Sequence, residues 1–216
     1  MIKDLSKNNS ILNQYVAELR DVDIQKDSMR FRKNMERIGE IIAYEISKIV
    51  EYQSEDVETP LGVSSVPKLK EKIVCGTISR AGLPFHQGLL NIFDSAESAF
   101  ITAYRKHKKD GIFEIEIEYV SSPDLNDKVV ILSDPMLATG SSMHLAYKAL
   151  LEKGTPKHTH IISILSSLQG INYMKKKLPS QNVTLWTAAI DAELTAKAYI
   201  VPGLGDAGDL AFGSKL

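Results

Sequence analysis

Cysteine is almost absent from this sequence of 216 residues, which contains one, Cys75. One cysteine excludes an internal disulfide framework and a cysteine-rich metal site, and this usage suits the reducing cytoplasm. Cys75 lies in the apolar run IVCGTI at 73–78, so we expect it to pack in the core. The fold must therefore be held together by buried apolar surface rather than by covalent links.

Long hydrophobic runs and an excess of one charge are missing too. No apolar run reaches the roughly 18 residues of a membrane-spanning helix, and the starting segment MIKDLSKNNS lacks the apolar centre of a signal peptide. Lysine and arginine number 26 against 27 for aspartate and glutamate, a formal net charge of -1. Any anion site must then be local. We expect a soluble, cytoplasmic protein that binds neither nucleic acid nor membrane.

Hydrophobic periodicity predicts two helices in the first part of what we expect to be a single domain, 1–216. Residues 11–20 have one apolar face, which predicts a short helix within an N-terminal arm at 1–27. Residues 28–50 carry apolar side chains at three- and four-residue steps. The predicted buried face of this amphipathic helix is Phe31, Met35, Ile38, Ile42, Ile46 and Ile49. Residues 51–69 have no periodicity and favour a connecting loop.

From residue 73 onward, short runs rich in isoleucine and valine alternate with stretches that can form helices. The predicted strands are 73–78, 98–104, 129–133, 160–165 and 183–188. The predicted helices are centred on 86–93, 140–152 and 169–178. This alternation is typical of an α/β fold in which right-handed crossovers build a mostly parallel central sheet, flanked by helices on both faces.

The segment IFEIEIEYV at 112–120 differs because apolar side chains alternate strictly with glutamates. Alternation with period two predicts an antiparallel, half-exposed strand, and we place it in a β flap at 106–127. Its three glutamates could be a ladder of metal ligands. A solvated strand face explains Glu114, Glu116 and Glu118 more simply.

Histidines and large aromatic residues point to no site of their own. His158 and His160 alternate at the start of a strand and could form a pair of metal ligands, but no third ligand lies near them in the sequence. We expect Trp186 and Tyr147 to pack in the core.

The most informative stretch is VVILSDPMLATGSS at 129–142, where a predicted strand gives way to a predicted helix. Ligands collect at such junctions in parallel sheets because helix N-termini present unpaired N–H groups there. Asp134 follows the strand, and Gly140 permits close approach of an anion. Hydroxyl side chains flank this glycine, from Thr139 before it and from Ser141 and Ser142 after it. No Gly-Lys-Ser/Thr follows, so this is not a Walker A loop. The residues alone leave two interpretations open, a phosphate site and an ordinary helix cap.

The string DPMLATGSS resembles the phosphoribosyl-pyrophosphate (PRPP) loop of uracil phosphoribosyltransferases, usually DPMLATGGS, from which it differs at Ser141. Further segments agree in order: IGEIIAYE at 38–45, SRAGL at 79–83, AYR at 103–105, and YIVPGLGDAGD at 199–209. Gly170 and the segment TAAID, which ends at Asp191, agree as well. The resemblance covers the chain from about residue 19 to the C-terminus.

The resemblance implies the phosphoribosyltransferase fold and an enzyme that transfers phosphoribosyl from PRPP to uracil. The products would be UMP and pyrophosphate, in pyrimidine salvage. It also implies Mg²⁺ as cofactor, a C-terminal hood at 190–216 that binds the base, and a homodimer or higher homo-oligomer, for which the N-terminal arm is a candidate contact. We expect uracil and PRPP as the small-molecule partners.

The same resemblance assigns the site residues. Catalytic roles fall to Asp134, Arg105 and Asp206, and Asp134 would also hold the metal directly or through water. The PRPP-binding residues would be Arg80, Arg105, Asp134, Pro135, Met136, Leu137, Ala138, Thr139, Gly140, Ser141, Ser142 and Asp206. The uracil-binding residues would be Ile200 through its backbone, Gly205, Asp206 and Ala207.

Three places depart from the family pattern, and we expect all of them in loops near the site. Residues 84–87, Pro-Phe-His-Gln, stand where the family has a segment with an acid, Leu168 and Gln169 replace Pro-Glu, and Leu210 replaces an arginine. These changes keep two alternatives open. One is a phosphoribosyltransferase for another base, and the other is a homologue without turnover that binds nucleotide or PRPP as a regulator.

Overall fold

The computed structural model describes residues 1–107, 113–179 and 181–214, without the side chains of 104–107 and 113–115. The helices are α1 (Ile11–Arg20), α2 (Ser28–Ser47), α3 (Leu83–Ile92), α4 (Ser141–Leu151), α5 (Leu168–Lys177) and α6 (Ala207–Phe212), with short 3-10 turns η1 (Leu5–Lys7) and η2 (Ile24–Lys26). The strands are β1 (Ile2–Asp4), β2 (Tyr52–Thr59), β3 (Gly62–Leu69), β4 (Ile73–Ser79), β5 (Glu97–His107), β6 (Phe113–Ser121), β7 (Val129–Ser133), β8 (Met136–Leu137), β9 (His158–Ser167), β10 (Val183–Asp191), β11 (Glu193–Leu194) and β12 (Ile200–Val201).

The central sheet has eight strands in the order β1-β10-β9-β7-β4-β5-β6, and β8 pairs with β9 beside this path. Every pairing in it is parallel except β5 with β6, which is antiparallel. The predicted α/β fold with a mostly parallel sheet is confirmed. Each predicted strand from 73 to 188 forms, and the structure adds β1, which joins the edge of the sheet beside β10.

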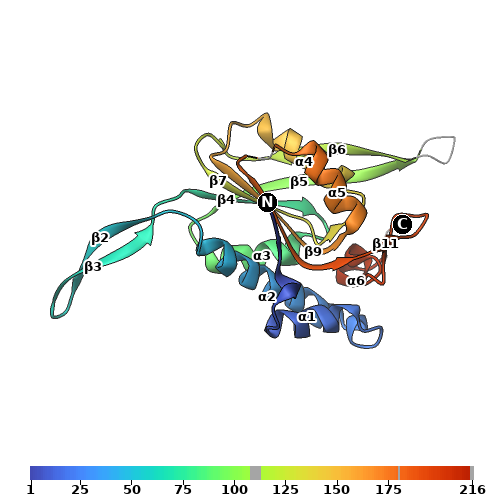
Figure 1. Cartoon of the computed structure of the whole chain (residues 1–216), viewed down its shortest axis with the longest axis horizontal. Coiled ribbons are helices and arrows are strands. Elements are labelled where there is room, and N and C mark those ends of the chain that lie inside the picture. Colours follow the sequence, from blue (N-terminus) through green and yellow to red (C-terminus); the bar gives the residue numbers. More distant parts are fainter. Residues whose placement is uncertain (108–112, 180, 215–216) are drawn as a thin grey trace.

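Helices cover both faces of this sheet, as Figure 1 shows, with α4 and α5 on one side and α1, α2 and α3 on the other. Between the sheet and the helices on each face lies a separate hydrophobic cluster. Cys75 and Trp186 lie in the cluster under α2, and Tyr147 lies in the cluster under α4, so all three pack in the core as predicted. Among the described residues, no helix is both long enough and apolar enough to cross a membrane.

Helix α2 forms as predicted but ends at Ser47, three residues before the predicted end. It begins where the Asp27 carboxylate accepts hydrogen bonds from the N–H groups of Met29 and Arg30, at 3.0 and 3.1 Å. The predicted apolar face is buried up to Ile46, whereas Ile49 lies past the helix end and is 54% exposed.

Two glycines let α2 and α3 pack with their backbones in close approach. A Cβ at Gly88 would lie 2.0 Å from the carbonyl oxygen of Glu36, and one at Gly39 would lie 2.4 Å from that of Phe85. Neither clash can be relieved by a side-chain rotation, because both obstacles are backbone atoms. The close packing of these two helices fixes the position of α3 after the end of β4.

We therefore expect Gly88→Ala to destabilise the protein by about 2 kcal/mol or more, because the helices must move apart in the core. Urea unfolding measures this loss. Gln87→Ala, on the exposed side of the same helix, is the control and should change stability by no more than about 0.5 kcal/mol. Equal stability of Gly88→Ala and Gln87→Ala would contradict the close packing.

The prediction of a connecting loop at 51–69 is wrong. These residues form the antiparallel hairpin β2–β3, which reaches away from the sheet in Figure 1. The hairpin is held by its backbone ladder and by cross-strand ion pairs such as Lys68 with Glu55, at 3.1 Å. Since neither face packs on the body, the two strands carry no alternating apolar pattern that a sequence could reveal.

The antiparallel strand predicted at 112–120 forms as β6 at the edge of the central sheet. Its register with β5 shifts beside Thr102, so the alternation in the sequence does not continue in space. Ile117 and Val120 therefore pack on the core, whereas Tyr119, predicted on the same face as Ile117, is 59% exposed. Part of the flap predicted at 106–127 lies outside the described residues.

Candidate active site

The carboxyl ends of β4, β5 and β7 meet at one edge of the sheet. Ser79 at the end of β4 is in register with Thr102, and Thr77 is in register with Ser133 at the end of β7. Arg80 and Asp134 each follow one of these strands directly, so both begin loops at this edge. Arg105 lies in β5 with its backbone opposite Ile115, but its side chain falls outside the described part of the structure.

The loop from Asp134 to Ser142 is anchored along β9. The N–H of Asp134 donates to the carbonyl of Ile162 at 3.2 Å, and the carbonyl of Pro135 accepts from Ile164 and Leu165 at 3.1 and 2.9 Å. Met136 and Leu137 then form β8, which pairs in parallel with β9. The loop therefore has a fixed backbone rather than being a free turn.

Ser167 and Gly170 brace this loop from behind. The Ser167 hydroxyl donates to the carbonyl of Ala138 at 2.5 Å and accepts from the N–H of Gly170 at 2.8 Å. Gly170 lies so close that an added Cβ would stand 2.4 Å from the Ala138 carbonyl oxygen. Helix α5 thus presses directly against the backbone of residues 137 and 138.

The loop ends at an open helix N-terminus. Gly140, at φ 85°, occupies the N-cap of α4, and no side chain caps the helix there. The Thr139 hydroxyl accepts weakly from the N–H of Ser141, at 3.4 Å, and contacts its hydroxyl at 3.3 Å. A helix of this kind presents backbone N–H groups and the positive end of its dipole, which is the arrangement that binds phosphate. The geometry therefore favours an anion site over an ordinary side-chain cap.

Asp134 has an unusual carboxyl group for a residue at the edge of a sheet. Burial raises its pKa from the ordinary value of 3.8 to about 7, because an ionised oxygen there loses hydration. One hydrogen bond opposes this shift, from the N–H of Met136 to Oδ1 at 3.2 Å. Only this one hydrogen bond offsets the lost hydration of the carboxyl group, so the group is available to accept hydrogen bonds or a cation from a ligand.

This pKa shift predicts a pH-dependent stability. The folded pKa is above the unfolded one, so the contribution of Asp134 to stability is fully present below the unfolded pKa and is lost as the pH rises through the folded pKa. Asp134→Asn should melt above the parent protein, by several degrees more at about pH 8 than at about pH 4. Thermal melts of both proteins across this pH range test the prediction. If the difference between their melting temperatures did not grow with pH, Asp134 would ionise normally.

Arg80 connects this edge to the C-terminal segment. Its Nη2 donates to Oδ1 of Asp209 at 2.7 Å and to the carbonyl of Gly213 at 2.8 Å. Asp206 caps α6 by accepting from the N–H of Asp209 at 3.0 Å. A Cβ at Gly208 would lie 3.2 Å from Oδ1 of Asp206 and 3.7 Å from Nε of Arg80, so the structure brings these two predicted site residues together.

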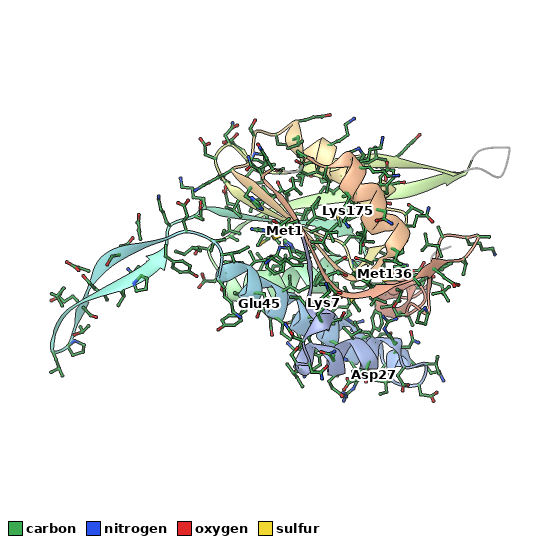
Figure 2. All side chains as sticks on the ribbon, in the orientation of Figure 1. Met1, Lys7, Asp27, Glu45, Met136 and Lys175 are labelled. Atoms are coloured by element: carbon green, nitrogen blue, oxygen red, sulfur yellow. The ribbon has the colours of Figure 1, made fainter. Side chains whose placement is uncertain are left out.

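The predicted base loop is built on the same hydrophobic cluster as the loop after β7. Ile200 and Ala207 are buried in that cluster, and Met136 and Ala138 pack against it. Figure 2 shows Met136 beside the C-terminal segment. Gly205 and Asp206 line a hollow of about 510 Å³, whose other side comes from the segment around η2. The loop at 199–207 contains β12 and the first residue of α6.

Sequence reasoning missed Gln25 and Lys26, which line the other side of this hollow. Both come from the N-terminal segment, far from the motifs along the chain. Residues 1–27, predicted as an arm, pack on the body of the chain through β1 and through α1, which buries Leu12, Val16 and Leu19. A single sequence contains no pattern that predicts such a contact.

The three departures were predicted in loops, and this is wrong. Residues 84–87 lie in the first turns of α3, with Phe85 and His86 buried. Leu168 and Gln169 begin α5, and Leu210 lies in α6. Residues 84–87 and 168–169 lie in the first turns of their helices, whereas Leu210 lies in the second half of α6. Pro84 suits a first helical turn because the N–H that it lacks would have no partner within the helix there.

His158 and His160, the candidate pair of metal ligands, make other contacts in the structure. The rings of His158 and His160 are 4.5 Å apart, but Nδ1 of His160 accepts from the indole N–H of Trp186 at 3.2 Å. Burial lowers the pKa of His160 to about 3, so it stays neutral. Within the described ranges, no three His, Cys, Asp or Glu side chains gather as metal ligands.

Comparisons with known proteins agree with this arrangement. Residues 6–214 match the family model described as Uracil phosphoribosyltransferase. A uracil phosphoribosyltransferase of Porphyromonas gingivalis is 58% identical over 212 residues, which cover 98% of each chain. One of Pyrococcus furiosus is 39% identical, covering 93% of this chain and 85% of its own. A solved structure from Aquifex aeolicus superposes with a TM-score of 0.88 at 28% identity over the full length of both chains.

Proposed function

This chain belongs to the uracil phosphoribosyltransferase family, and we propose that it transfers the phosphoribosyl group of PRPP to uracil, giving UMP and pyrophosphate for pyrimidine salvage. The observation that carries this proposal is the arrangement of two loops at one edge of the sheet. An open helix N-terminus after Gly140 suits a phosphate, and a glycine-rich loop at 199–207 suits a flat heterocycle. Arg80 lies against the helix that follows this second loop.

The 5'-phosphate of PRPP binds the backbone N–H groups and hydroxyls from Thr139 to Ser142. Arg80 binds the pyrophosphate with its planar guanidinium, which donates paired hydrogen bonds to phosphate oxygens. The ion pair between Arg80 and Asp209 is partly exposed to solvent, so pyrophosphate can take the place of the Asp209 carboxylate. Arg105 has the same role by its place in the family motif. Asp134 accepts hydrogen bonds from the ribose hydroxyls.

The reaction breaks the bond between C1 of the ribose and pyrophosphate and forms a bond from C1 to a ring nitrogen of uracil, which releases its proton to solvent or to the departing pyrophosphate. Positive charge develops on the ribose and negative charge on the leaving group. The residues described here act by holding both substrates in line and by placing donors where the negative charge grows. Backbone groups near Ile200, Gly205 and Ala207 pair with the edge of uracil, and Asp206 faces the ribose.

We propose Mg²⁺ as the cofactor. Mg²⁺ is commonly bound by one or two carboxylates together with substrate phosphates and water, so a site without a cluster of protein ligands fits it. Asp134, whose buried carboxyl has one weak hydrogen bond, would hold the ion directly or through water. When bound, the ion neutralises charge on the pyrophosphate.

We also propose a cytoplasmic location and a homo-oligomer. The single cysteine, Cys75, is buried as a free thiol, so the fold uses no internal disulfide that would need an oxidising compartment. Assembly with a second copy would cover apolar side chains near the hairpin tip, where Leu61 and Val63 are 100% and 71% exposed.

Parallel assays with PRPP, Mg²⁺ and six bases test the choice of substrate. We expect nucleotide from uracil and none from the five other bases. Cytosine, hypoxanthine and adenine present other patterns of donors and acceptors, and thymine and orotate carry an extra methyl or carboxylate group that a loop fitted to uracil would exclude. Nucleotide from a different base would keep the reaction and overturn uracil as its acceptor.

A further inference from the structure

A largely buried ion pair joins the N-terminal helix to the end of the sheet. Arg20 is the last residue of α1, and Asp191 is the last residue of β10. Two parallel hydrogen bonds link them, from Nη1 to Oδ2 and from Nη2 to Oδ1, both 2.8 Å. The side chain of Asp191 is 6% exposed. Bidentate pairs of this kind fix orientation as well as distance.

The same pair holds both peptide groups of Gly203. Oδ2 of Asp191 accepts from the N–H of Gly203 at 3.0 Å, and Nη1 of Arg20 donates to the carbonyl of Gly203 at 3.0 Å. Gly203 has φ 60°, and an added Cβ would lie 2.0 Å from the carbonyl oxygen of Ile200. The backbone at this point therefore has one orientation, fixed by two charged side chains that are distant in sequence.

Gly203 stands between the two parts of the proposed base site. Ile200 precedes it by three residues, and Gly205 to Ala207 follow it closely. A loop that recognises a base through backbone groups gains affinity only if those groups are already in place, since ordering them on binding would cost free energy. Gly203 and Gly205, both at positive φ, have no side chains whose packing could fix this middle part of the loop.

We propose that Arg20 and Asp191 are positioning residues for base binding, which act through Gly203 and do not touch the base. This inference rests on the proposed function, because it assigns the 199–207 loop to uracil. It gives the N-terminal helix a part in substrate selection, although α1 contains none of the motif residues. It also predicts an effect confined to one substrate, since no described contact of the pair reaches the loop at 134–142.

Steady-state kinetics of Arg20→Ala, Arg20→Lys and Asp191→Asn test this. We expect Arg20→Ala to raise the KM for uracil at least about tenfold while the KM for PRPP changes by less than about twofold. Arg20→Lys should be intermediate, because one ammonium cannot reproduce the paired bonds and still reach the Gly203 carbonyl. Arg30→Ala is the matched control. Arg30 forms a more exposed pair with Glu18 of α1, at 3.3 Å, and should leave both KM values unchanged.

Amide hydrogen exchange supplies a readout that does not need turnover. The amides of 199–207 should exchange at least about tenfold faster in Arg20→Lys than in the parent protein, while those of β7 and β9 stay protected. Unchanged loop exchange, or a KM for PRPP that rises as much as that for uracil, would overturn the positioning role. If the parent protein forms no UMP, the proposed function fails, and the exchange data then decide separately whether the pair orders this loop.

Discussion

Asp134→Asn is expected to lower the turnover number by about two orders of magnitude or more, because the amide removes a preorganised negative charge that we propose stabilises the positive charge developing on the ribose. The substitution keeps the size of the side chain and an oxygen that can accept from the N–H of Met136, so the loop should keep its conformation. The effect should therefore appear in kcat at saturating substrates, measured as UMP formed per minute. It should also accompany the raised melting temperature expected for this variant.

Asp94→Asn is the control for Asp134→Asn. Asp94 is an exposed carboxylate just before β5, at the opposite edge of the sheet from the site. Its substitution should leave kcat within about twofold of the parent value. A near-normal kcat for Asp134→Asn, with Asp94→Asn unchanged, would remove Asp134 from the catalytic site.

Gly170→Ala should weaken PRPP binding by about 100-fold, because moving the loop breaks hydrogen bonds to a charged phosphate. Each such bond contributes about 1.5–3 kcal/mol, and about 1.4 kcal/mol is tenfold in affinity. The new methyl group would lie 2.4 Å from the carbonyl oxygen of Ala138 and 2.7 Å from that of Leu137. Both atoms belong to the proposed phosphate loop, which must move aside. Alanine favours helix over glycine by up to about 1 kcal/mol, so loss of α5 is not the expected cause.

Isothermal titration with PRPP and Mg²⁺ measures this effect, and thermal melting shows whether the variant remains folded. Gly76→Ala is the matched control, because its Cβ would meet Leu132 at 3.4 Å, close to an ordinary contact between side chains. Parent-like affinity in Gly170→Ala would mean that the phosphate is bound elsewhere.

Elements with at least one buried face could be predicted from the sequence, and elements without one could not. Helix α2 and the inner strands follow the burial pattern, since Phe31 to Ile46 and the β7 residues supply apolar side chains at the required spacing. The β2–β3 hairpin was missed because neither of its faces packs on the body. Tyr119 was assigned to the wrong face because a change of register cannot be seen in one strand alone.

The candidate site divides in the same way. Contiguous motifs revealed the loops at 134–142 and 199–209, and the structure places Arg80 and Asp206 together. The brace from Ser167 and Gly170 and the Arg20 to Asp191 pair depend on residues separated by 29 to 183 positions, which no local pattern encodes. The roles of the individual site residues stay predictions until variants are measured.

The most direct test of the central claim is a time course of UMP and pyrophosphate formed by the purified protein from uracil, PRPP and Mg²⁺. The account predicts that both products appear together, in equal amounts, over many turnovers per protein. It would be contradicted if neither product formed while PRPP or UMP still bound to the protein. The loops at the edge of the sheet would then belong to a binding protein rather than to an enzyme.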